Sequence, residues 1–341
     1  MAEIKPIVSD HSGTWHRERF AEFARAKAAI GEPTPHMRVV DHLSRDVDDQ
    51  ERVWRAGAYL AAYSVLTGEA IWSAWPWTAL GDEDMRARLL PWLQANWGGV
   101  HTRRPRRCVR TPEKFYRCLL GYADWERKAF PLLRAMDLID PREEYDVWWD
   151  SVTEIPFFGR YIAIRALELF RRWGYMSAHL YDIRAVGAHS PIRCLMLLRP
   201  DCVGDLMTGE PGTVDRIGGE VKTEFGLDMS WFTYATLLCE YRSAYEDRND
   251  FAGHQIDEEL SYATSRYADH WRARGFESQL LAARAAVHPV ETLGEVQGWQ
   301  AMRRTTEAAL RNWGIVWSDL DYDWHATIAA GRPILRSELA A

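Results

Sequence analysis

The chain has 341 residues, of which 47% are hydrophobic and 27% charged, and this composition excludes an intrinsically disordered protein. No apolar run reaches the length of a membrane span and residues 1–10 lack a signal-peptide core, so we expect a soluble, cytoplasmic protein. The net charge of −7 excludes a surface coated with positive charge, so a nucleic-acid contact would need a local basic patch.

Helical periodicity dominates the sequence and alternating strand patterns are scarce, which predicts an all-α fold. The first predicted helices span residues 14–30, 48–67 and 82–97. Thr111 and Asp140 each precede a proline at the start of a helical stretch, and an N-cap followed by proline is typical of a helix start. Further helices are predicted over residues 227–248, 255–274 and 297–313. No linker is evident, so we expect one compact bilobal domain over residues 1–341.

The segment HTRRPRRCVR, residues 101–110, holds five arginines in ten positions around a proline. A cluster of this kind can neutralise DNA phosphates, so we predict phosphate contacts from Arg103, Arg104, Arg106 and Arg107. The alternative is a solvated loop without a ligand.

The segment SVTEIPFFGRYIAIRALELFRRWG, residues 151–174, joins two predicted helices through a short turn that ends at a glycine. We predict a helix–hairpin–helix over residues 140–174. Its second helix is expected to bury one face, while the opposite side carries Arg165, Glu168 and Arg172.

In such a hairpin, backbone N–H groups at the start of the second helix can hold a DNA phosphate, since the helix dipole favours negative charge there. Gly159 would permit close approach because it has no side chain, and Phe158 and Arg160 flank it. The alternative is ordinary packing of two helices, with Arg160 paired to Glu154 at the surface.

The stretch IPFFGRYIAIRAL is similar to the hairpin of the helix–hairpin–helix DNA glycosylase superfamily, whose pattern is apolar-Pro-Gly-x-Gly followed by a helix. Phe157 replaces the first glycine of that pattern. Tyr161 stands where some members carry a lyase lysine, which argues against a Schiff-base lyase. The superfamily also has an aspartate about twenty residues after the hairpin, and this sequence offers Asp182 in HLYDIRAVG nearby. The resemblance implies a bilobal helical fold of the glycosylase type.

Two later segments extend the likeness: MTGEPGTVDRIGG, residues 207–219, and TLLCEYRSAYEDR, residues 236–248. A glycine hairpin, a Pro-Gly turn and an LCE helix in this order resemble the α-glutamyl/putrescinyl thymine pyrophosphorylases, or amino acid:DNA transferases. These phage-associated enzymes are related to the helical domain of 5-hydroxymethyluracil DNA kinases. The resemblance covers residues 112–271. No GxxxxGK[ST] occurs, so the chain is not itself a P-loop kinase.

The resemblance implies a reaction on double-stranded DNA that carries an activated, phosphorylated or pyrophosphorylated 5-hydroxymethyluracil. An amine from an amino acid or a polyamine would displace the phosphate or pyrophosphate and leave a hypermodified thymine. The base would have to leave the stack to be enclosed. A DNA kinase is then a possible partner, and the enzyme would work in the host cytoplasm if it is phage-encoded. We expect no cofactor and no metal. The five cysteines form no CxxC pair, which argues against a zinc ribbon or an iron–sulfur loop.

This chemistry needs a proton acceptor for the amine, and Glu240 and Asp182 are the candidates. Glu240 lies in LLCEY, where its apolar neighbours are expected to desolvate it and make it a better base near neutral pH. Asp182 is the candidate orienting or backup acid. The structural alternatives are a buried ion pair for Glu240 and a helix cap for Asp182.

The leaving phosphate needs positive charge or N–H donors. Gly209 and Gly212, before a short predicted helix, are candidates for an anion-binding turn, and the alternative is an ordinary loop.

Two other functions remain open. A monofunctional DNA glycosylase would use Asp182 to stabilise a sugar cation and would leave an abasic site. A non-catalytic helical DNA-binding module would recruit a modifying enzyme and alter no nucleoside itself.

Overall fold

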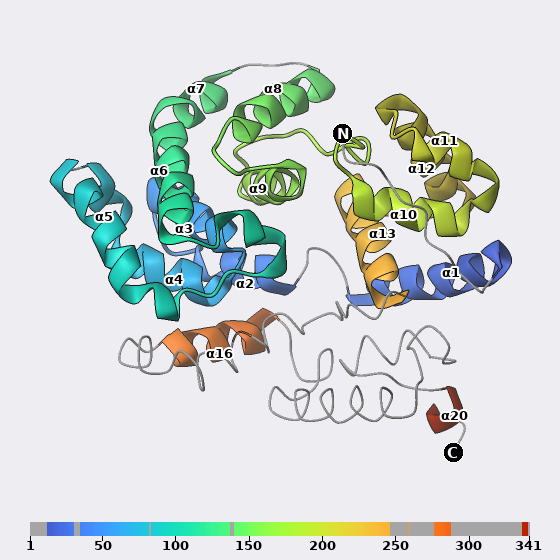
Figure 1. Cartoon of the computed structure of the whole chain (residues 1–341), viewed down its shortest axis with the longest axis horizontal. Coiled ribbons are helices and arrows are strands. Elements are labelled where there is room, and N and C mark those ends of the chain that lie inside the picture. Colours follow the sequence, from blue (N-terminus) through green and yellow to red (C-terminus); the bar gives the residue numbers. More distant parts are fainter. Residues whose placement is uncertain are drawn as a thin grey trace. The chain divides into compact units, whose positions relative to one another are not determined.

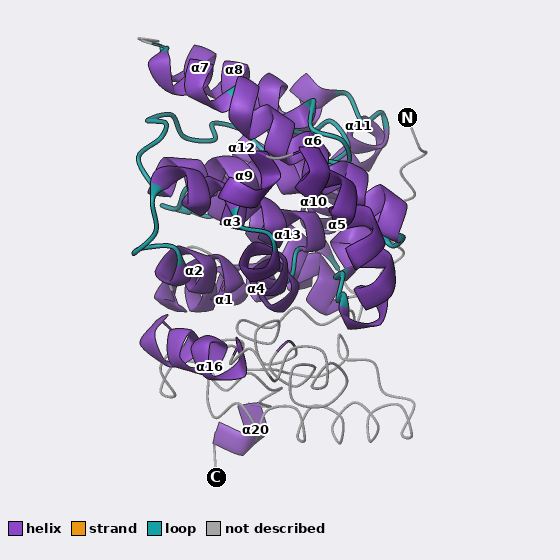
Figure 2. Cartoon of the chain, turned by 90° about the vertical axis from the view of Figure 1, so that its left-hand side faces the viewer, coloured by secondary structure: helices purple, strands orange, loops and turns teal. Residues whose placement is uncertain are grey.

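The computed structural model describes residues 12–30, 35–81, 83–136, 140–245, 259, 276–287 and 336–339. All regular elements in these residues are helices and none is a strand, which confirms the predicted all-α class (Figures 1 and 2). No helix within these ranges is long and apolar enough to cross a membrane. The helices predicted over residues 255–274 and 297–313 lie outside the described residues.

The chain divides into two compact units. Unit 1 comprises Met1–Thr34, Leu180–Asp257 and His288–Ala341, and unit 2 comprises Pro35–His179 and Glu258–Val287.

Unit 1 contains α1, α10, α11, α12, α13 and the short helices η4 and α20. Their bounds are Gly13–Ile30 (α1), His189–Leu198 (α10), Pro200–Cys202 (η4), Val203–Met207 (α11), Pro211–Glu224 (α12), Trp231–Tyr245 (α13) and Arg336–Leu339 (α20). The helix predicted over residues 14–30 is α1. The helix predicted over residues 227–248 begins later, at Trp231, because the side chain of Ser230 accepts the N–H of Thr233 and caps α13 there.

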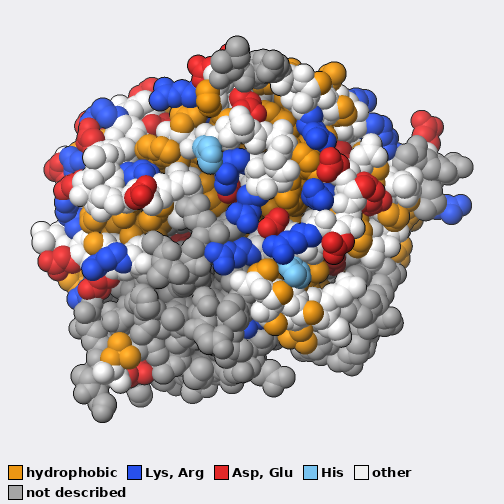
Figure 3. Space-filling model, turned by 180° about the vertical axis from the view of Figure 1, so that it is seen from behind, with side chains coloured by type: hydrophobic (Ala, Val, Ile, Leu, Met, Phe, Trp, Pro, Cys, Tyr) orange, Lys and Arg blue, Asp and Glu red, His pale blue; other side chains and the backbone are white. Residues whose placement is uncertain are grey.

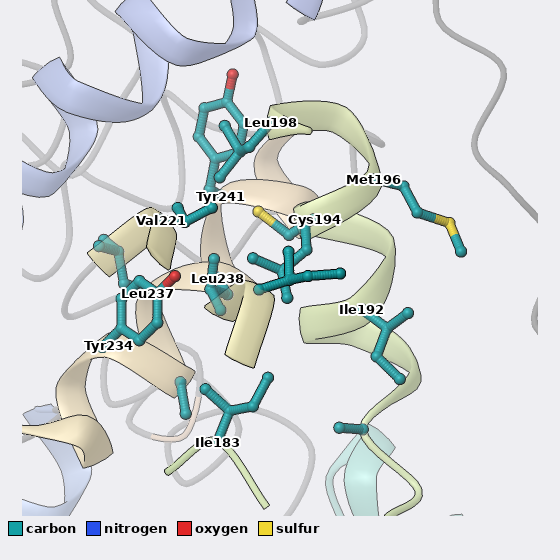
Figure 4. Close-up of a cluster of buried hydrophobic side chains, with 14 of the residues drawn as sticks. Ile183, Ile192, Cys194, Met196, Leu198, Val221, Tyr234, Leu237, Leu238 and Tyr241 are labelled. Atoms are coloured by element: carbon teal, nitrogen blue, oxygen red, sulfur yellow. The ribbon is translucent and has the colours of Figure 1, made fainter. Parts of the chain in front are cut away.

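The core of unit 1 lies where α10 packs against α13, with α1 and α12 also contributing. Figure 4 shows Cys194 and Leu198 of α10 on the side that faces Leu238 and Tyr241 of α13. The hydroxyl of Tyr241 donates to the carbonyl oxygen of His16 over 3.2 Å, which ties α13 to α1. The polar end of this buried ring therefore has a partner.

Unit 2 contains α2 to α9, α16 and three 3₁₀ helices. Their bounds are Pro35–Leu43 (α2), Asp49–Ala62 (α3), Val65–Ala74 (α4), Trp77–Gly81 (η1), Glu83–Asn96 (α5), Trp97–Gly99 (η2), Arg104–Val109 (η3), Pro112–Lys128 (α6), Phe130–Ala135 (α7), Pro141–Thr153 (α8), Arg160–Arg172 (α9) and Phe276–Val287 (α16). Helix α3 is central and packs against α4, α6 and α9. All its residues from Val53 to Ala62 are buried, as expected for a helix surrounded by others.

The single helix predicted over residues 48–67 is wrong, because two helices occupy this stretch. Tyr63 takes a left-handed conformation with φ 53° and ends α3. Ser64 then accepts the N–H of Thr67 and caps α4. The second helix folds back on the first, and a Cβ on Gly68 would lie 2.8 Å from the Cα of Tyr59. Only glycine permits this approach.

The predicted helix starts at Thr111 and Asp140 are confirmed. Thr111 accepts the N–H of Lys114 at the start of α6, and Asp140 accepts the N–H of Arg142 at the start of α8. The proline after each cap occupies the first helical position, where no intrahelical N–H bond is lost.

The predicted polar side of α9 is wrong for two of its three residues. Arg165 and Glu168 are buried, and only Arg172 is exposed. Arg171 donates two hydrogen bonds to the carboxylate of Glu168, so this buried charge is paired. Amphipathic spacing therefore underestimated how completely the surrounding helices cover α9.

Candidate functional site

The hairpin, residues 155–159, connects α8 to α9 in a tight turn. The N–H of Phe158 donates to the carbonyl oxygen of Ile155 over 2.9 Å and closes it. Phe157 has φ 67°, in the left-handed region that glycine adopts most easily. Phe157, which replaces the first glycine of the hairpin pattern, therefore has a backbone conformation that favours glycine.

Arg106 holds this turn from inside the protein. Its side chain is buried, with Nη1 donating to the carbonyl oxygen of Phe157 over 2.7 Å and Nε donating to that of Ala61 over 2.7 Å. Nη2 donates to Sγ of Cys118 over 3.0 Å. These bonds can offset the strain of a bulky residue at positive φ. We therefore correct the phosphate contact predicted for Arg106, because its guanidinium is enclosed and bonded to protein atoms.

Gly159, by contrast, faces open space at the N-terminus of α9. It is exposed, and a Cβ at this position would meet no heavy atom of the described residues within 4 Å. Its φ of −80° and ψ of 178° are accessible to any residue. No side chain caps α9 there. Neither packing nor backbone conformation requires a glycine at position 159. A reason for the glycine would be an external group that approaches the backbone closely.

The buried Phe158 fixes the hairpin on α6. Its ring packs against Tyr122 with centroids 5.5 Å apart. One residue earlier on α6, a Cβ on Gly121 would lie 2.4 Å from Cδ of Pro156, so the α6 backbone and the hairpin are in close contact. Phe158 is thus an anchor of the turn, and we correct its predicted role as a direct DNA contact.

The other predicted phosphate-binding arginines have different environments. The Arg103 side chain is only 10% exposed and lies 3.6 Å from the carboxylate of Glu259. Arg107 is exposed, and Arg160 is partly buried beside Gly159. The side chain of Arg104 lies outside the described residues. Arg107 and Arg160 therefore remain the candidates for phosphate contacts.

One basic residue near the hairpin was missed in the sequence. Arg117 is exposed on α6, and its guanidinium carbon lies 5.6 Å from the centre of the Phe157 ring. No local pattern connects residues forty positions apart, since the proximity follows from the packing of the hairpin on α6. Figure 3 shows Lys and Arg side chains interspersed with Asp, Glu and hydrophobic side chains on the face that it draws.

A cluster of tyrosines and an arginine adjoins the first turn of α9. The hydroxyls of Tyr161 and Tyr63 lie 2.8 Å apart, and Nη2 of Arg165 donates to the Tyr161 hydroxyl over 3.4 Å. The ring of His36 lies 4.8 Å from that of Tyr63. Burial raises the pKa of Tyr63, while the nearby Arg165 acts in the opposite direction. Tyr161, at the position of a lyase lysine in the resemblance, thus belongs to a connected group of polar side chains.

Asp182 lies in unit 1, where it stabilises a turn and not a helix end. Its Oδ1 accepts the N–H of Arg184 over 2.8 Å and lies 3.6 Å from Nε of the same residue. Arg184 has φ 47°, which this side-chain hydrogen bond helps to maintain. The adjacent Ile183 donates its N–H to Asp215 over 3.1 Å.

The predicted anion-binding turn precedes α12, also in unit 1. Gly209 is buried with φ 66°, and its N–H donates to the carbonyl oxygen of Leu206 over 3.2 Å. Gly212 is exposed in the first turn, and within the described ranges a Cβ there would meet no atom within 4 Å. Glu210, the N-cap residue, adds a carboxylate to this terminus. Only Gly212 therefore remains open to an anion, beside a negative charge that disfavours one.

Glu240 is partly buried on α13. Its neighbours Leu237, Leu238 and Tyr241 belong to the core of unit 1, whereas Glu240 lies at the edge of that core. The expected apolar surrounding is therefore incomplete. Among the described residues, the hairpin and the tyrosine cluster belong to unit 2, and Asp182, Gly212 and Glu240 belong to unit 1.

Comparison with known proteins adds no further constraint. No protein-family model matches the chain, and no curated protein and no solved structure matches it. Function must therefore be argued from the residues and their geometry.

Proposed function

We propose that the chain is a DNA-modifying transferase with a helix–hairpin–helix fold of the glycosylase type. It would displace phosphate or pyrophosphate from activated 5-hydroxymethyluracil in DNA with the amine of an amino acid or polyamine. The observation that carries the proposal is the open glycine at the start of α9, next to a turn that Arg106 braces from within.

The hairpin would bind one phosphate of the DNA backbone. The first N–H groups of a helix have no carbonyl partner within it, and the helix dipole makes this end attractive to an anion. Gly159 leaves the approach unobstructed. Arg107, Arg117 and Arg160 are the cations that would neutralise neighbouring phosphates.

A rigid phosphate anchor suits an enzyme that must extrude a base, because unstacking costs a few kcal/mol that backbone contacts have to offset. Tyr161 follows Gly159 by two residues, so a base extruded beside the anchored phosphate would lie near this hydroxyl. Tyr161 can donate or accept a hydrogen bond to the base, and Arg165 lies behind it. Glu240 is the proposed proton acceptor for the amine, with Asp182 in an orienting role.

Mass spectrometry of nucleosides tests this function. DNA containing 5-hydroxymethyluracil is treated with a DNA kinase and then incubated with the protein and a mixture of amino acids and polyamines. The transferase predicts an intact nucleoside that is heavier by the attached amine. An abasic site would indicate a glycosylase instead. DNA binding with unchanged nucleosides would indicate a recruiting module.

The same assay tests Glu240 as the proton acceptor. Glu240→Gln preserves shape but removes the charge, so we expect transfer to fall by about 10²-fold, the usual effect of losing a general base. DNA affinity should be unchanged. Asp182→Asn serves as the comparison. Full activity of Glu240→Gln with an inactive Asp182→Asn would reverse the two roles, and two active variants would place the chemistry elsewhere.

A further inference from the structure

A cavity of about 450 Å³ lies in unit 2, between the start of α3, η1, the end of α6 and α7. Its volume is within the range of pockets that hold small molecules, roughly 300–1,000 Å³. The residues that characterise it are Asp49, Trp77, Glu126, Arg127, Phe130 and Arg134. None of them belongs to the hairpin.

Glu126 is the unusual member of this lining. It is 3% exposed, and neither carboxyl oxygen has a hydrogen-bond partner in the described part of the chain. Leaving a buried polar group unsatisfied costs about 1–3 kcal/mol, so native proteins rarely retain one without a use. Burial raises the pKa of Glu126 well above its usual value, with Glu51 and Asp48 adding to the shift and Arg127 opposing it.

The second carboxylate of the pocket is already satisfied. The Tyr175 hydroxyl donates to Asp49 over 2.9 Å, and Nη1 of Arg134 donates to it over 2.8 Å. Although partial burial acts in the opposite direction, these two hydrogen bonds and the charge of Arg134 lower the pKa of Asp49. The two carboxyl groups therefore differ, and Glu126 is the one that a ligand could complete.

Two exposed arginines line the same cavity as this buried acid. The Arg127 guanidinium lies 5.0 Å from the centre of the Trp77 ring, and that of Arg134 lies 5.9 Å from the centre of the Phe130 ring. Arg127 donates one hydrogen bond to the carbonyl oxygen of Leu80, and Arg134 donates one to Asp49. A guanidinium has five N–H donors, so each retains donors for a carboxylate.

We propose that this pocket binds a free α-amino acid, with its carboxylate on Arg127 and Arg134 and with the Glu126 side chain turning toward its ammonium group, because both Glu126 oxygens are buried before binding. An ammonium beside Glu126 would favour the ionised carboxylate. The lining then carries two positive and two negative charges, which matches a zwitterion. Trp77 and Phe130 provide apolar walls for its side chain.

The same charges disfavour a polyamine. Putrescine has two ammonium groups and no carboxylate, so its second cation would meet Arg127 and Arg134 without a compensating anion. Like-charge contacts of this kind are a common source of specificity. The pocket thus distinguishes between the two amine classes that the sequence leaves open.

The position of the pocket relates it to the proposed reaction. Helix α6 contacts the hairpin at Gly121 and presents Glu126 five residues later, about 8 Å further along the helix axis. The pocket would therefore hold a supply of the amine donor near the hairpin, and not the reacting amine itself, whose proposed proton acceptor is Glu240. That use rests on the proposed function, whereas amino-acid binding itself does not.

The test uses the full chain without DNA. The twenty protein amino acids and putrescine are screened by thermal shift at about 10 mM, which detects weak binding because a ligand of the native state raises the melting temperature. The best amino acid is then titrated calorimetrically beside its N-acetyl and decarboxylated analogues. We expect each analogue to bind at least about tenfold more weakly, since each lacks one of the two charged contacts.

Variants assign the two ends of the ligand. Glu126→Gln should weaken binding of the amino acid at least about tenfold, while Glu113→Gln, an exposed acid on the same helix, should not. Arg134→Gln should weaken the amino acid but not its decarboxylated analogue. Equal binding of the N-acetyl analogue, an unchanged Glu126→Gln, or no shift with any of the twenty amino acids would overturn the proposal. Because no DNA is present, these outcomes are independent of whether the chain modifies DNA.

Discussion

At the scale of single residues, Gly159 and Arg106 differ in what they contribute to the hairpin. Gly159 lies on its exposed side, and Arg106 holds it from the interior. Gly159 has open space before it, and Arg106 uses its guanidinium on protein acceptors. The sequence predicts a phosphate contact for both residues, because Arg106 lies in a basic segment and Gly159 in a glycine hairpin. Their burial in the folded chain shows that only Gly159 is accessible.

Gly159→Asp should weaken DNA binding without unfolding the protein. Aspartate is a favourable N-cap, so α9 should be as stable as before or more stable. Its carboxylate would nevertheless repel a phosphate at the same helix end, and we expect the dissociation constant to rise about tenfold or more at fixed low salt. Fluorescence anisotropy with duplex DNA measures this. Gly204→Asp, at another open glycine, is the control, and equal affinity of Gly159→Asp and wild type would exclude the hairpin as a DNA contact.

Arg106 and Arg107 should respond differently to alanine. Arg106→Ala leaves the carbonyl groups of Phe157 and Ala61 without their donor, so we expect a loss of stability of about 2–4 kcal/mol. Arg107→Ala should change stability by less than about 0.5 kcal/mol but lower the salt dependence of DNA binding by about one unit of slope. Urea unfolding and salt titrations measure the two effects. If the salt dependence of DNA binding is the same for Arg107→Ala and wild type, Arg107 does not contact a DNA phosphate.

At the scale of elements, the hairpin depends on helix α6. Phe158 packs on Tyr122, Arg117 lies beside Phe157, and Gly121 lets Pro156 approach the α6 backbone. The position of the α9 N-terminus is therefore set by a helix that precedes it by more than thirty residues in the sequence.

Gly121→Ala should displace the hairpin. The new Cβ would lie 2.4 Å from Cδ of Pro156, and because proline is rigid the turn itself must shift. Overpacking of this kind costs about 1–3 kcal/mol. We expect lower stability together with weaker DNA binding, measured by urea unfolding and anisotropy. If stability falls but the affinity for DNA stays at the wild-type value, the contact between α6 and the hairpin is not needed for DNA binding.

At the scale of the whole molecule, the buried acid Glu126 should affect how stability varies with pH. Burial raises its pKa in the folded state above that in the unfolded chain. The folded protein then binds the extra proton, so the contribution of Glu126 is greatest at low pH and is lost as pH rises through the folded-state pKa. The acidic neighbours Glu51 and Asp48 act in the same direction.

Glu126→Gln should therefore be more stable than wild type at pH 8, with the difference shrinking toward pH 4. The glutamine has no proton to lose, so the variant avoids the cost of ionising a desolvated carboxyl. Melting temperatures of the two proteins between pH 4 and pH 8 measure this. Glu113→Gln should not show this trend, because hydrogen bonds to its own backbone and to Gln94 lower the pKa of this exposed acid and do not raise it. A constant difference across the range would mean that Glu126 is not buried as described.

Local sequence determined the all-α class and several helix starts. Thr111 and Asp140 cap α6 and α8 as predicted, because an N-cap bonds to an N–H only two or three residues away. The glycine that opens α9 was also visible in the sequence. Glu126 had a signal that was missed, since it continues the helical spacing of the buried residues Phe115, Leu119 and Tyr122.

Tertiary structure alone decided which polar groups face inward. The burial of Arg165 follows from the helices that pack around α9, and amphipathic spacing does not show how many helices will do so. Arg106 bonds to residues 45 and 51 positions away, a distance over which no periodic pattern carries information. The pocket around Glu126 likewise joins four separate helical segments, so its mixture of one unsatisfied acid and two arginines exists only in the folded chain.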